Sequence, residues 1–364
     1  MSKQVVAVVF GGRSSEHAIS VATAGGVLAA IDRDRYEVVP IGITANGRFV
    51  AQPDDAAQFT LSDGRLPELA DSDTEVIWPS EVGDRTLRAT NGDGALRDLA
   101  VIDVVLPLLH GPYGEDGTVQ GLFELADIPY VGSGVLASAV GTDKQYTKIV
   151  LQAAGLEVGR YQTVTLEQWR SAPDEVRERI AALGHPVFVK PARAGSSVGV
   201  SKVTDAAELA QAFDVAFAED DKALVEAGLV GREIELAVLG SRDGSGTRVS
   251  QVAGEIVVDG DGFYDFDAKY LPDSPAHTVC PAQVTDTELV ELRRVAKAAF
   301  EALDCRGLAR VDVFLTADGV VVNEVNTIPG FTPISMFPML WEASGVGYRD
   351  LITDLLEQAT AARG

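Results

Sequence analysis

Apolar residues run almost without interruption along two short segments near the N-terminus, residues 4–12 and 36–44. Between them, residues 20–31 carry apolar side chains at helical spacing. The order strand, helix, strand is typical of a parallel α/β domain. We therefore predict that the chain opens with a parallel-sheet α/β domain, whose ligands bind at the C-terminal ends of the strands.

The sequence that follows mixes buried strands with an acidic, turn-rich stretch. Residues 101–111 predict another buried strand, and the loop after it leads into a helix with Thr118 as its N-cap. Residues 128–134 predict a further strand and turn. Residues 51–99 contain turn sequences such as PDD, SDG and NGDG, which indicate an irregular insertion or a small hairpin.

Two α+β units are predicted in the remaining sequence. In the second unit we expect a helix at residues 143–155, a strand at 161–166, two strands around a Gly-rich loop at 186–203, and a helix at 206–218. In the third unit we expect strands at residues 249–258, a polar loop at 259–281, a helix at 286–303, a hairpin at 311–327 and a terminal helix at 348–361. We predict domains spanning residues 1–141, 142–234 and 235–364.

Composition and charge narrow the class of protein. The 364 residues are 46% hydrophobic, and 30 Lys plus Arg against 54 Asp plus Glu give a net charge of −24. Such a charge repels nucleic acid and anionic membranes, so neither is expected as a partner. The apolar N-terminus runs directly into Gly11, which favours a first strand over a signal peptide. Cys280 and Cys305 lack metal-ligand spacing and are expected to be reduced, in keeping with a cytoplasmic location.

The predicted hairpin VDVFLTADGVVVNEVNT, residues 311–327, carries acids among valines. Side chains alternate between the faces of a strand. A three-residue loop, residues 317–319, would place Asp312 opposite Glu324 and Arg310 opposite Asn326. Two facing carboxylates repel each other unless a cation or a shared proton lies between them.

Two interpretations of these acids remain open from the residues alone. Mg²⁺ prefers hard oxygen ligands, typically one or two carboxylates together with substrate phosphates. Alternatively, Arg310 neutralises both acids in a structural ion-pair network. The oxygen of Asn326 on the same face favours the metal.

Four other stretches are candidates for binding. In VKPARAGSSVGVSKV, Lys190 ends a strand before a Gly/Ser loop, which could cover phosphates or be only a hairpin turn, and which lacks the P-loop pattern. Glu16 lies at a strand-to-helix turn, as a ligand for an ammonium or as a capping acid. His110 precedes a similar turn, where a lone histidine is more often structural. The aromatic loop FYDFDAKYL, with Lys269, is a candidate lid.

Together these motifs resemble those of the D-alanine–D-alanine ligases of the ATP-grasp superfamily, over nearly the whole chain outside residues 51–99. The motifs occur in the family's order: FGGRSSEHAIS, LHGPYGEDGTVQG, GSGVLASAVGTDK, VKPARAGSSVGV, DAKY, GLARVDVF and NEVNTIPGFTPISMFP. The resemblance implies that the N-terminal domain is followed by the two α+β domains of an ATP-grasp fold. The chain departs from the pattern at Ala227-Gly228, where many relatives carry a lysine and an aromatic residue beside adenine.

The resemblance also implies a role for each matching position. ATP would be bound through its phosphates by Lys144 and Lys190, through adenine by Glu226, through ribose by Glu233, and at the hinge by Leu229. The implied ligands of two Mg²⁺ or Mn²⁺ ions are Asp312, Glu324 and Asn326, with a monovalent cation as a further candidate.

The amino-acid substrates have their own implied set. Glu16 would hold the ammonium of the first D-alanine and form a hydrogen-bonded set with Ser196 and Tyr270, while Lys269 contacts the γ-phosphate. Arg310 and the backbone N–H of Gly330 would stabilise the oxyanion. The second D-alanine would be received by His110, Ser335 and Met336.

The implied reaction is the ATP-dependent joining of two D-alanines through an acyl phosphate, for peptidoglycan precursors, by a homodimer. The alternatives are a ligase that joins D-alanine to D-lactate or D-serine, and a non-catalytic ATP-grasp nucleotide-binding protein. The DAKY loop and the Ser335-Met336 pair argue against the first alternative. The retained metal ligands and lysines argue against the second.

Overall fold

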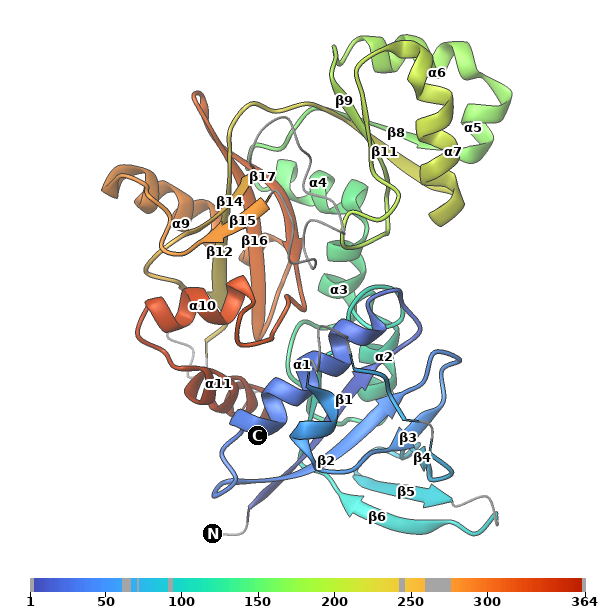
Figure 1. Ribbon diagram of the computed structural model, residues 1–364, viewed down its shortest axis with the longest axis vertical. Helices are drawn as coiled ribbons and strands as arrows, with labels where there is room; N and C mark the ends of the chain where they lie inside the picture. The colour runs from blue at the N-terminus through green and yellow to red at the C-terminus, as the bar shows by residue number, and fades with distance from the viewer. Residues whose placement is uncertain are drawn as a thin grey trace.

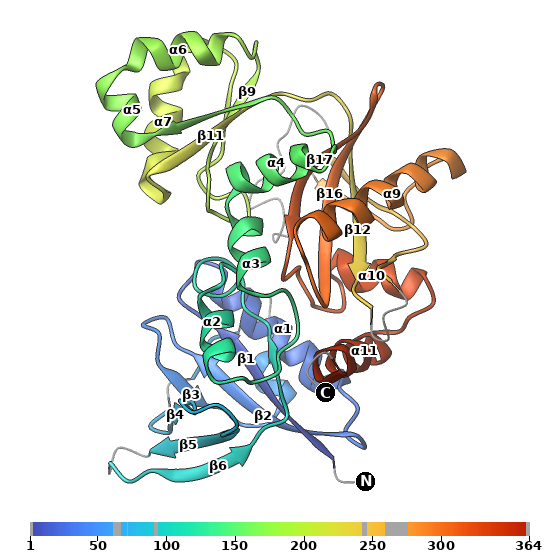
Figure 2. The ribbon, with the colours of Figure 1, turned by 180° about the vertical axis from the view of Figure 1, so that it is seen from behind.

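The computed structural model describes residues 3–60, 67–70, 72–90, 94–241, 246–258 and 276–361. Within these residues the strands form three sheets, of seven, four and six strands. Figures 1 and 2 show the sheets in three successive parts of the chain, with the C-terminal helix back beside the N-terminal part. In the described part of the chain, the helices are all too short or too polar to cross a membrane.

The N-terminal sheet has a parallel centre and an antiparallel extension. Its centre is formed by β1 (Gln4–Gly11), β2 (Tyr36–Ile43) and β7 (Val104–Pro107), with α1 (His17–Ala30) connecting β1 to β2. The strand order is β6-β5-β4-β3-β2-β1-β7. This arrangement confirms the predicted parallel α/β opening.

The acidic segment is better ordered than its turn-rich sequence predicts. It contributes four strands to the first sheet: β3 (Phe49–Ala51), β4 (Glu75–Ile77), β5 (Thr86–Thr90) and β6 (Arg97–Val101). A 3₁₀ turn, η1 (Ala56–Phe59), lies between the first two of them. Each of these strands pairs antiparallel with the next, so the segment forms a meander where only a small hairpin or an irregular insertion was expected. The reason is burial, because Val50, Val76 and Leu87 insert into the core of this domain.

Three further predictions for the N-terminal part were wrong in detail. The single strand expected at residues 101–111 is divided, because Asp103 turns to accept a hydrogen bond from the N–H of Val5. Residues 128–134 form only an isolated bridge, at Tyr130. Helix α2 (Thr118–Leu125) is capped by Gly117 in a left-handed conformation, and Thr118 is its first helical residue.

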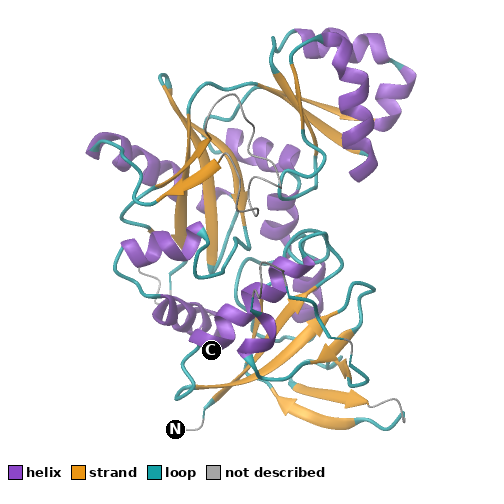
Figure 3. Cartoon of the chain, in the orientation of Figure 1, coloured by secondary structure: helices purple, strands orange, loops and turns teal. Residues whose placement is uncertain are grey.

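The second sheet is antiparallel and stands apart at the top of Figure 3. Its strand order is β10-β9-β11-β8. The strands are β8 (Tyr161–Thr165), β9 (Val187–Pro191), β10 (Ser201–Val203) and β11 (Lys222–Ala227). One face is covered by α5 (Leu166–Ser171), α6 (Pro173–Ala181) and α7 (Leu209–Glu219), the last preceded by η2 (Ala206–Glu208). The β9–β10 connection is the Gly-rich loop.

The third sheet carries the hairpin and is packed against helices from two parts of the chain. Its strands are β12 (Arg232–Leu239), β13 (Arg248–Val249), β14 (Gly254–Val258), β15 (Ala276–Val279), β16 (Leu308–Thr316) and β17 (Gly319–Asn326). The helices are α3 (Val135–Thr142), α4 (Lys144–Ala153) and α9 (Asp286–Ala302). Strand β15 lies within the predicted polar loop. Because β12 crosses the expected division at residue 235 and α4 packs on this sheet, the three domain boundaries stay a proposal.

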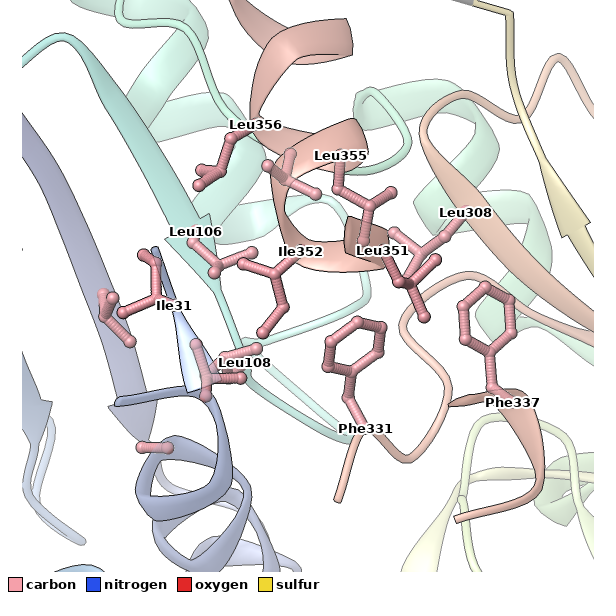
Figure 4. Close-up of a cluster of buried hydrophobic side chains, with 14 of the residues drawn as sticks. Ile31, Leu106, Leu108, Leu308, Phe331, Phe337, Leu351, Ile352, Leu355 and Leu356 are labelled. Atoms are coloured by element: carbon pink, nitrogen blue, oxygen red, sulfur yellow. The ribbon is translucent and has the colours of Figure 1, made fainter. Parts of the chain in front are cut away.

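The C-terminal helices join the third sheet to the first. Helix α10 (Met336–Ala343) leads to α11 (Tyr348–Ala361), whose bounds agree with the prediction. In Figure 4, Ile352 of α11 points toward Leu106 of β7 and Leu108 just after it, and Phe331 and Leu308 belong to the same buried cluster. This shared core fixes the end of β1 relative to the hairpin.

Leu355 of α11 is 1% exposed within that cluster. We expect Leu355→Ala to lower the free energy of unfolding by about 2–5 kcal/mol, because the substitution leaves a cavity in a packed core. Denaturant unfolding measures the loss. Val290→Ala is the control, since Val290 is 68% exposed on α9 and its loss should stay within about 0.5 kcal/mol. Equal losses in the two variants would contradict the role given to this core.

Candidate active site

A single cavity of about 900 Å³ lies where the three sheets meet. The start of α1, the loop after β7, the end of β9, the β16–β17 hairpin and the loop before α10 all contribute to its wall. Every predicted site residue that the structure describes lines it: Glu16, His110, Lys144, Lys190, Ser196, Leu229, Glu226, Glu233, Arg310, Asp312, Glu324, Asn326, Gly330, Ser335 and Met336. Lys269 and Tyr270 lie outside the described residues.

The facing acids of the hairpin are present as predicted, but the turn is not. Asp312 pairs with Glu324, and Arg310 pairs with Asn326. The loop has two residues, because Thr316 pairs with Gly319, so the expected three-residue loop was wrong. A β-bulge after Asp312 inserts one extra residue in β17 and restores the register. Without the bulge, the shorter turn would have placed the wrong residue opposite Asp312.

Asp312 is held by a cation from its own strand. Arg310 donates from Nε and Nη2 to the two carboxylate oxygens of Asp312, at 2.7 and 2.6 Å, and its Nε also lies 3.3 Å from a carboxylate oxygen of Glu235. Asn326 donates to Asp312 at 2.9 Å. Burial disfavours the charged guanidinium, but Asp312 and Glu235 outweigh it and raise the pKa of Arg310. Arg310 thus forms the expected ion pair with Asp312. The carboxylate of Glu324 has Lys144 as a neighbouring cation, with Nζ 3.9 Å from Oε2.

The donor set of the hairpin fits a hard divalent cation. Asp312, Glu324 and Asn326 offer two carboxylates and an amide oxygen along one face. Within the described residues, no three His, Cys, Asp or Glu side chains are grouped closely enough to hold a metal by themselves. Two carboxylates and one amide oxygen suit Mg²⁺, which takes few protein carboxylates and completes its coordination shell with phosphates and water.

A second charged group occupies the part of the cavity next to the second sheet. Glu226 forms close ion pairs with Lys190 and with Lys148, whose Nζ lies 2.6 Å from its Oε1. Burial opposes its ionisation, yet the charges of Lys190 and Lys148 outweigh this and lower the pKa of Glu226 to about 2. Lys148 was missed by the sequence analysis, because a lysine in a helical pattern gives no signal that it is buried.

The Gly-rich loop brings the second sheet to the N-terminal domain. Ser196, at φ +46°, donates a short hydrogen bond to Glu16, and Lys144 donates to the carbonyl of Ala194 at 2.7 Å. A Cβ on Gly195 would lie 2.9 Å from the carboxylate of Glu16, so a larger residue would disturb the contact. Glu16 lies at the N-cap position of α1, but its side chain makes no capping hydrogen bond there.

His110 and Glu115 are buried beside Glu16. Nδ1 of His110 lies 3.1 Å from the carbonyl oxygen of Ile328, and burial lowers the pKa of His110, so the ring is neutral near pH 7. Glu115 accepts the N–H of Gly111 at 2.8 Å. Burial, aided by the charge of Glu16, raises the pKa of Glu115 to about 8. The sequence had indicated Glu115 only as part of a turn.

The remaining residues lie at the two edges of the cavity. Ser335 begins α10 and accepts the N–H of Thr332 at 3.1 Å, which holds the loop that contains Gly330. At the other edge, Gly228 follows β11 and donates to the carbonyl of Pro186 at 2.8 Å. A Cβ on Gly228 would lie 3.0 Å from Pro186, so the hinge next to Leu229 is closely packed.

Solved structures of high similarity share this fold. The D-Ala:D-Ser ligase VanG of Enterococcus faecalis is 32% identical with a TM-score of 0.84, covering 98% of this chain and 100% of that one. The D-alanine-D-alanine ligase of Coxiella burnetii is 33% identical with a TM-score of 0.82, covering 100% of this chain and 95% of that one. The fold and the cavity define a ligase of the ATP-grasp class.

Family models and curated relatives narrow the class. The model for the D-ala D-ala ligase N-terminus matches residues 5–133, and that for the C-terminus matches residues 150–357. The chain belongs to the D-alanine–D-alanine ligase family. The D-alanine–D-alanine ligase of Pseudarthrobacter chlorophenolicus is 51% identical over 98% of this chain and 94% of its own length. That of Kineococcus radiotolerans is 52% identical, over 98% and 96%.

The raised pKa of Glu115 predicts a pH dependence of stability. Between its ordinary value of 4.5 and about 8, the folded protein binds a proton at Glu115 that the unfolded chain has released. This contribution to stability is complete below 4.5 and is lost as the pH rises through 8. We therefore expect Glu115→Gln to gain stability relative to the wild type between pH 5 and 8.5, as measured by denaturant unfolding.

Glu81→Gln is the control, because Glu81 is exposed and its stability should follow that of the wild type at each pH. A Glu115→Gln variant whose difference from the wild type does not change with pH would contradict the burial of an uncharged Glu115.

Proposed function

We propose that this cavity is where the chain joins two D-alanines into D-alanyl-D-alanine for peptidoglycan synthesis, the reaction of its family. ATP is consumed: the carboxylate of the first D-alanine takes the γ-phosphoryl group, and the amine of the second displaces phosphate from the resulting acyl phosphate. The observation that carries the proposal is that the described residues implied by the resemblance, from all three sheets, line one cavity.

The lysines of the cavity bind the phosphates of ATP. Lys144 and Lys190 are both oriented by internal acceptors, the carbonyl of Ala194 and the carboxylate of Glu226. Phosphate oxygens can replace these acceptors without any large movement of the chain, so the site is organised before the nucleotide arrives. Glu226 accepts the amino group of adenine and Glu233 the ribose hydroxyls.

Asp312, Glu324 and Asn326 would hold two Mg²⁺ or Mn²⁺ ions, and a monovalent cation is a further candidate. The ions would offset the negative charge that gathers on the phosphates. Arg310 already neutralises part of the charge of Asp312. The ions would neutralise the rest of that charge together with the charge of Glu324.

The amino acids occupy the N-terminal and C-terminal walls. Glu16, fixed by Ser196, binds the ammonium of the first D-alanine. The guanidinium of Arg310 and the N–H of Gly330 stabilise the oxyanion that forms when the second amine attacks. His110, Ser335 and Met336 receive the second D-alanine, and the uncharged ring of His110 adds no repulsion against an amine. The roles given to Lys269 and Tyr270 stay predictions.

The D-serine alternative has one observation in its favour, the similarity to a D-Ala:D-Ser ligase. Curated relatives about 50% identical over nearly the whole chain are D-alanine–D-alanine ligases, which favours D-alanine as the second substrate. We also propose a homodimer, on the strength of the family resemblance alone.

Glu324→Gln tests the metal site. We expect at least about a hundredfold loss of turnover, because an amide is a poorer ligand than a carboxylate. The loss should be smaller at high Mg²⁺ concentration, and the unfolding curve should be close to that of the wild type. Phosphate release with ATP, Mg²⁺ and D-alanine measures turnover. Asp318→Asn, at the exposed turn of the same hairpin, should keep full activity. Unchanged turnover of Glu324→Gln at ordinary Mg²⁺ would rule out the assignment.

A competition experiment tests the choice of second substrate. With equimolar D-alanine, D-serine and D-lactate, we expect D-alanyl-D-alanine as the main product at neutral pH. Its yield should grow toward alkaline pH, because the attacking amine must lose its proton. Chromatographic separation of the products measures their ratio, with L-alanine as the negative control. A main product ending in D-serine or D-lactate would overturn the proposal.

A further inference from the structure

Glu226 is buried together with two ammonium groups, one on each carboxylate oxygen. Lys148 lies 2.6 Å from Oε1, and Lys190 forms a close ion pair with Oε2. The side chains are 2%, 12% and 11% exposed for Lys148, Lys190 and Glu226. The two ammonium groups and the carboxylate therefore carry a net charge of one positive unit, and all three side chains are largely closed to water.

The two lysines are attached to different parts of the molecule. Lys190 is the last residue but one of β9, just before the Gly-rich loop, and it lines the cavity in which phosphates are proposed to bind. Lys148 lies in the middle of α4, which packs against β17 and α9 in the C-terminal sheet domain. Its ammonium is enclosed by Glu226 and by the ring of Tyr161, at 5.7 Å. Lys190 can exchange Glu226 for a phosphate. Lys148 is then the cation that remains beside Glu226, and without it the buried carboxylate would have no counter-ion.

We propose that Lys148 is the permanent counter-ion of Glu226, a positioning residue that sets the selectivity of the site for adenine over guanine nucleotides. The inference rests on the proposed function, which assigns adenine to Glu226 and phosphate to Lys190. When phosphate oxygens take Lys190, Lys148 keeps the carboxylate charged and in place. It also links the second sheet to the C-terminal sheet domain through a charge contact.

The selectivity follows from the chemistry of the bases. Adenine offers an amino group that donates to a carboxylate, whereas guanine offers an oxygen at the corresponding position, which can only accept. A site built to pair with one of these groups rejects the other strongly, because buried polar atoms are left unpaired. A carboxylate without its cation would instead take up a proton or turn away, since burial disfavours its charge. A protonated carboxyl can donate to the guanine oxygen, so selectivity would fall.

Lys148→Met removes the charge with little change of shape. We expect its KM for ATP to rise about tenfold or more, the effect of a lost hydrogen bond to a charged group, with kcat within about threefold of the wild type. The ratio of kcat/KM for ATP to that for GTP should fall about tenfold. Calorimetric binding of ADP and GDP, which needs no turnover, should show the same fall. Lys148→Arg should restore most of the ratio, and Lys297→Met, an exposed lysine of α9, should leave it unchanged.

A double-mutant cycle decides whether Lys148 acts through Glu226. Glu226→Gln should lose selectivity to the same extent, and Lys148→Met should then add no further loss. If Lys148→Met alone does not fold, the double variant should fold again, because both buried charges leave together. An unchanged ATP-to-GTP ratio in Lys148→Met, additive losses, or a double variant that stays unfolded would each overturn the inference.

The wild type separates this inference from the proposed function. A wild type that binds ADP in preference to GDP but forms no D-alanyl-D-alanine would contradict the proposed function and leave the role of Lys148 supported by the binding data. A wild type without preference for ADP would contradict the assignment of adenine to Glu226, and this inference with it.

Discussion

The pairing of Asp312 with Glu324 places two carboxylates side by side in a buried cavity, and the rest of the site answers that constraint. Glu235, on the neighbouring strand β12, lies opposite Asp312 and adds a third negative charge. Arg310 offsets part of it from within β16, and Lys144 approaches Glu324 from the start of α4. Carboxylates so close together are stable only when cations compensate their charge. The metal ions that accompany a nucleotide would supply such cations.

The same balance of charges would allow a protein with a net charge of −24 to bind ATP, as its family implies. Lys144, Lys148 and Lys190 line the cavity, and each is oriented by an acceptor of the protein itself. Burial lowers the pKa of Lys144 and of Lys148, while neighbouring carboxylates oppose that shift. Binding of phosphate would therefore replace the carbonyl of Ala194 on Lys144 and the carboxylate of Glu226 on Lys190, while Lys148 would stay paired with Glu226, so that no buried charge is left uncompensated.

The cavity exists because three sheets are held at fixed positions. The buried cluster around α11 ties the N-terminal sheet to the C-terminal one, and so sets Glu16 and His110 against the hairpin. The second sheet is attached through the Gly-rich loop, by Ser196 on Glu16 and by Lys144 on Ala194. These contacts are polar, as is the pair of Lys148 with Glu226, which suits a part of the molecule proposed to admit and release a nucleotide.

The sequence by itself determined most of the long elements, the terminal helix and most of the residues that meet in the cavity, because these depend on periodicity and on local motifs. Only the tertiary structure decided the bulge that sets Asp312 against Glu324, the strands of the acidic segment, and the burial of Lys148. Each of these depends on which distant surface a segment packs against. A local pattern is the same for a lysine in water and for one enclosed beside Glu226, so only the folded chain distinguishes them.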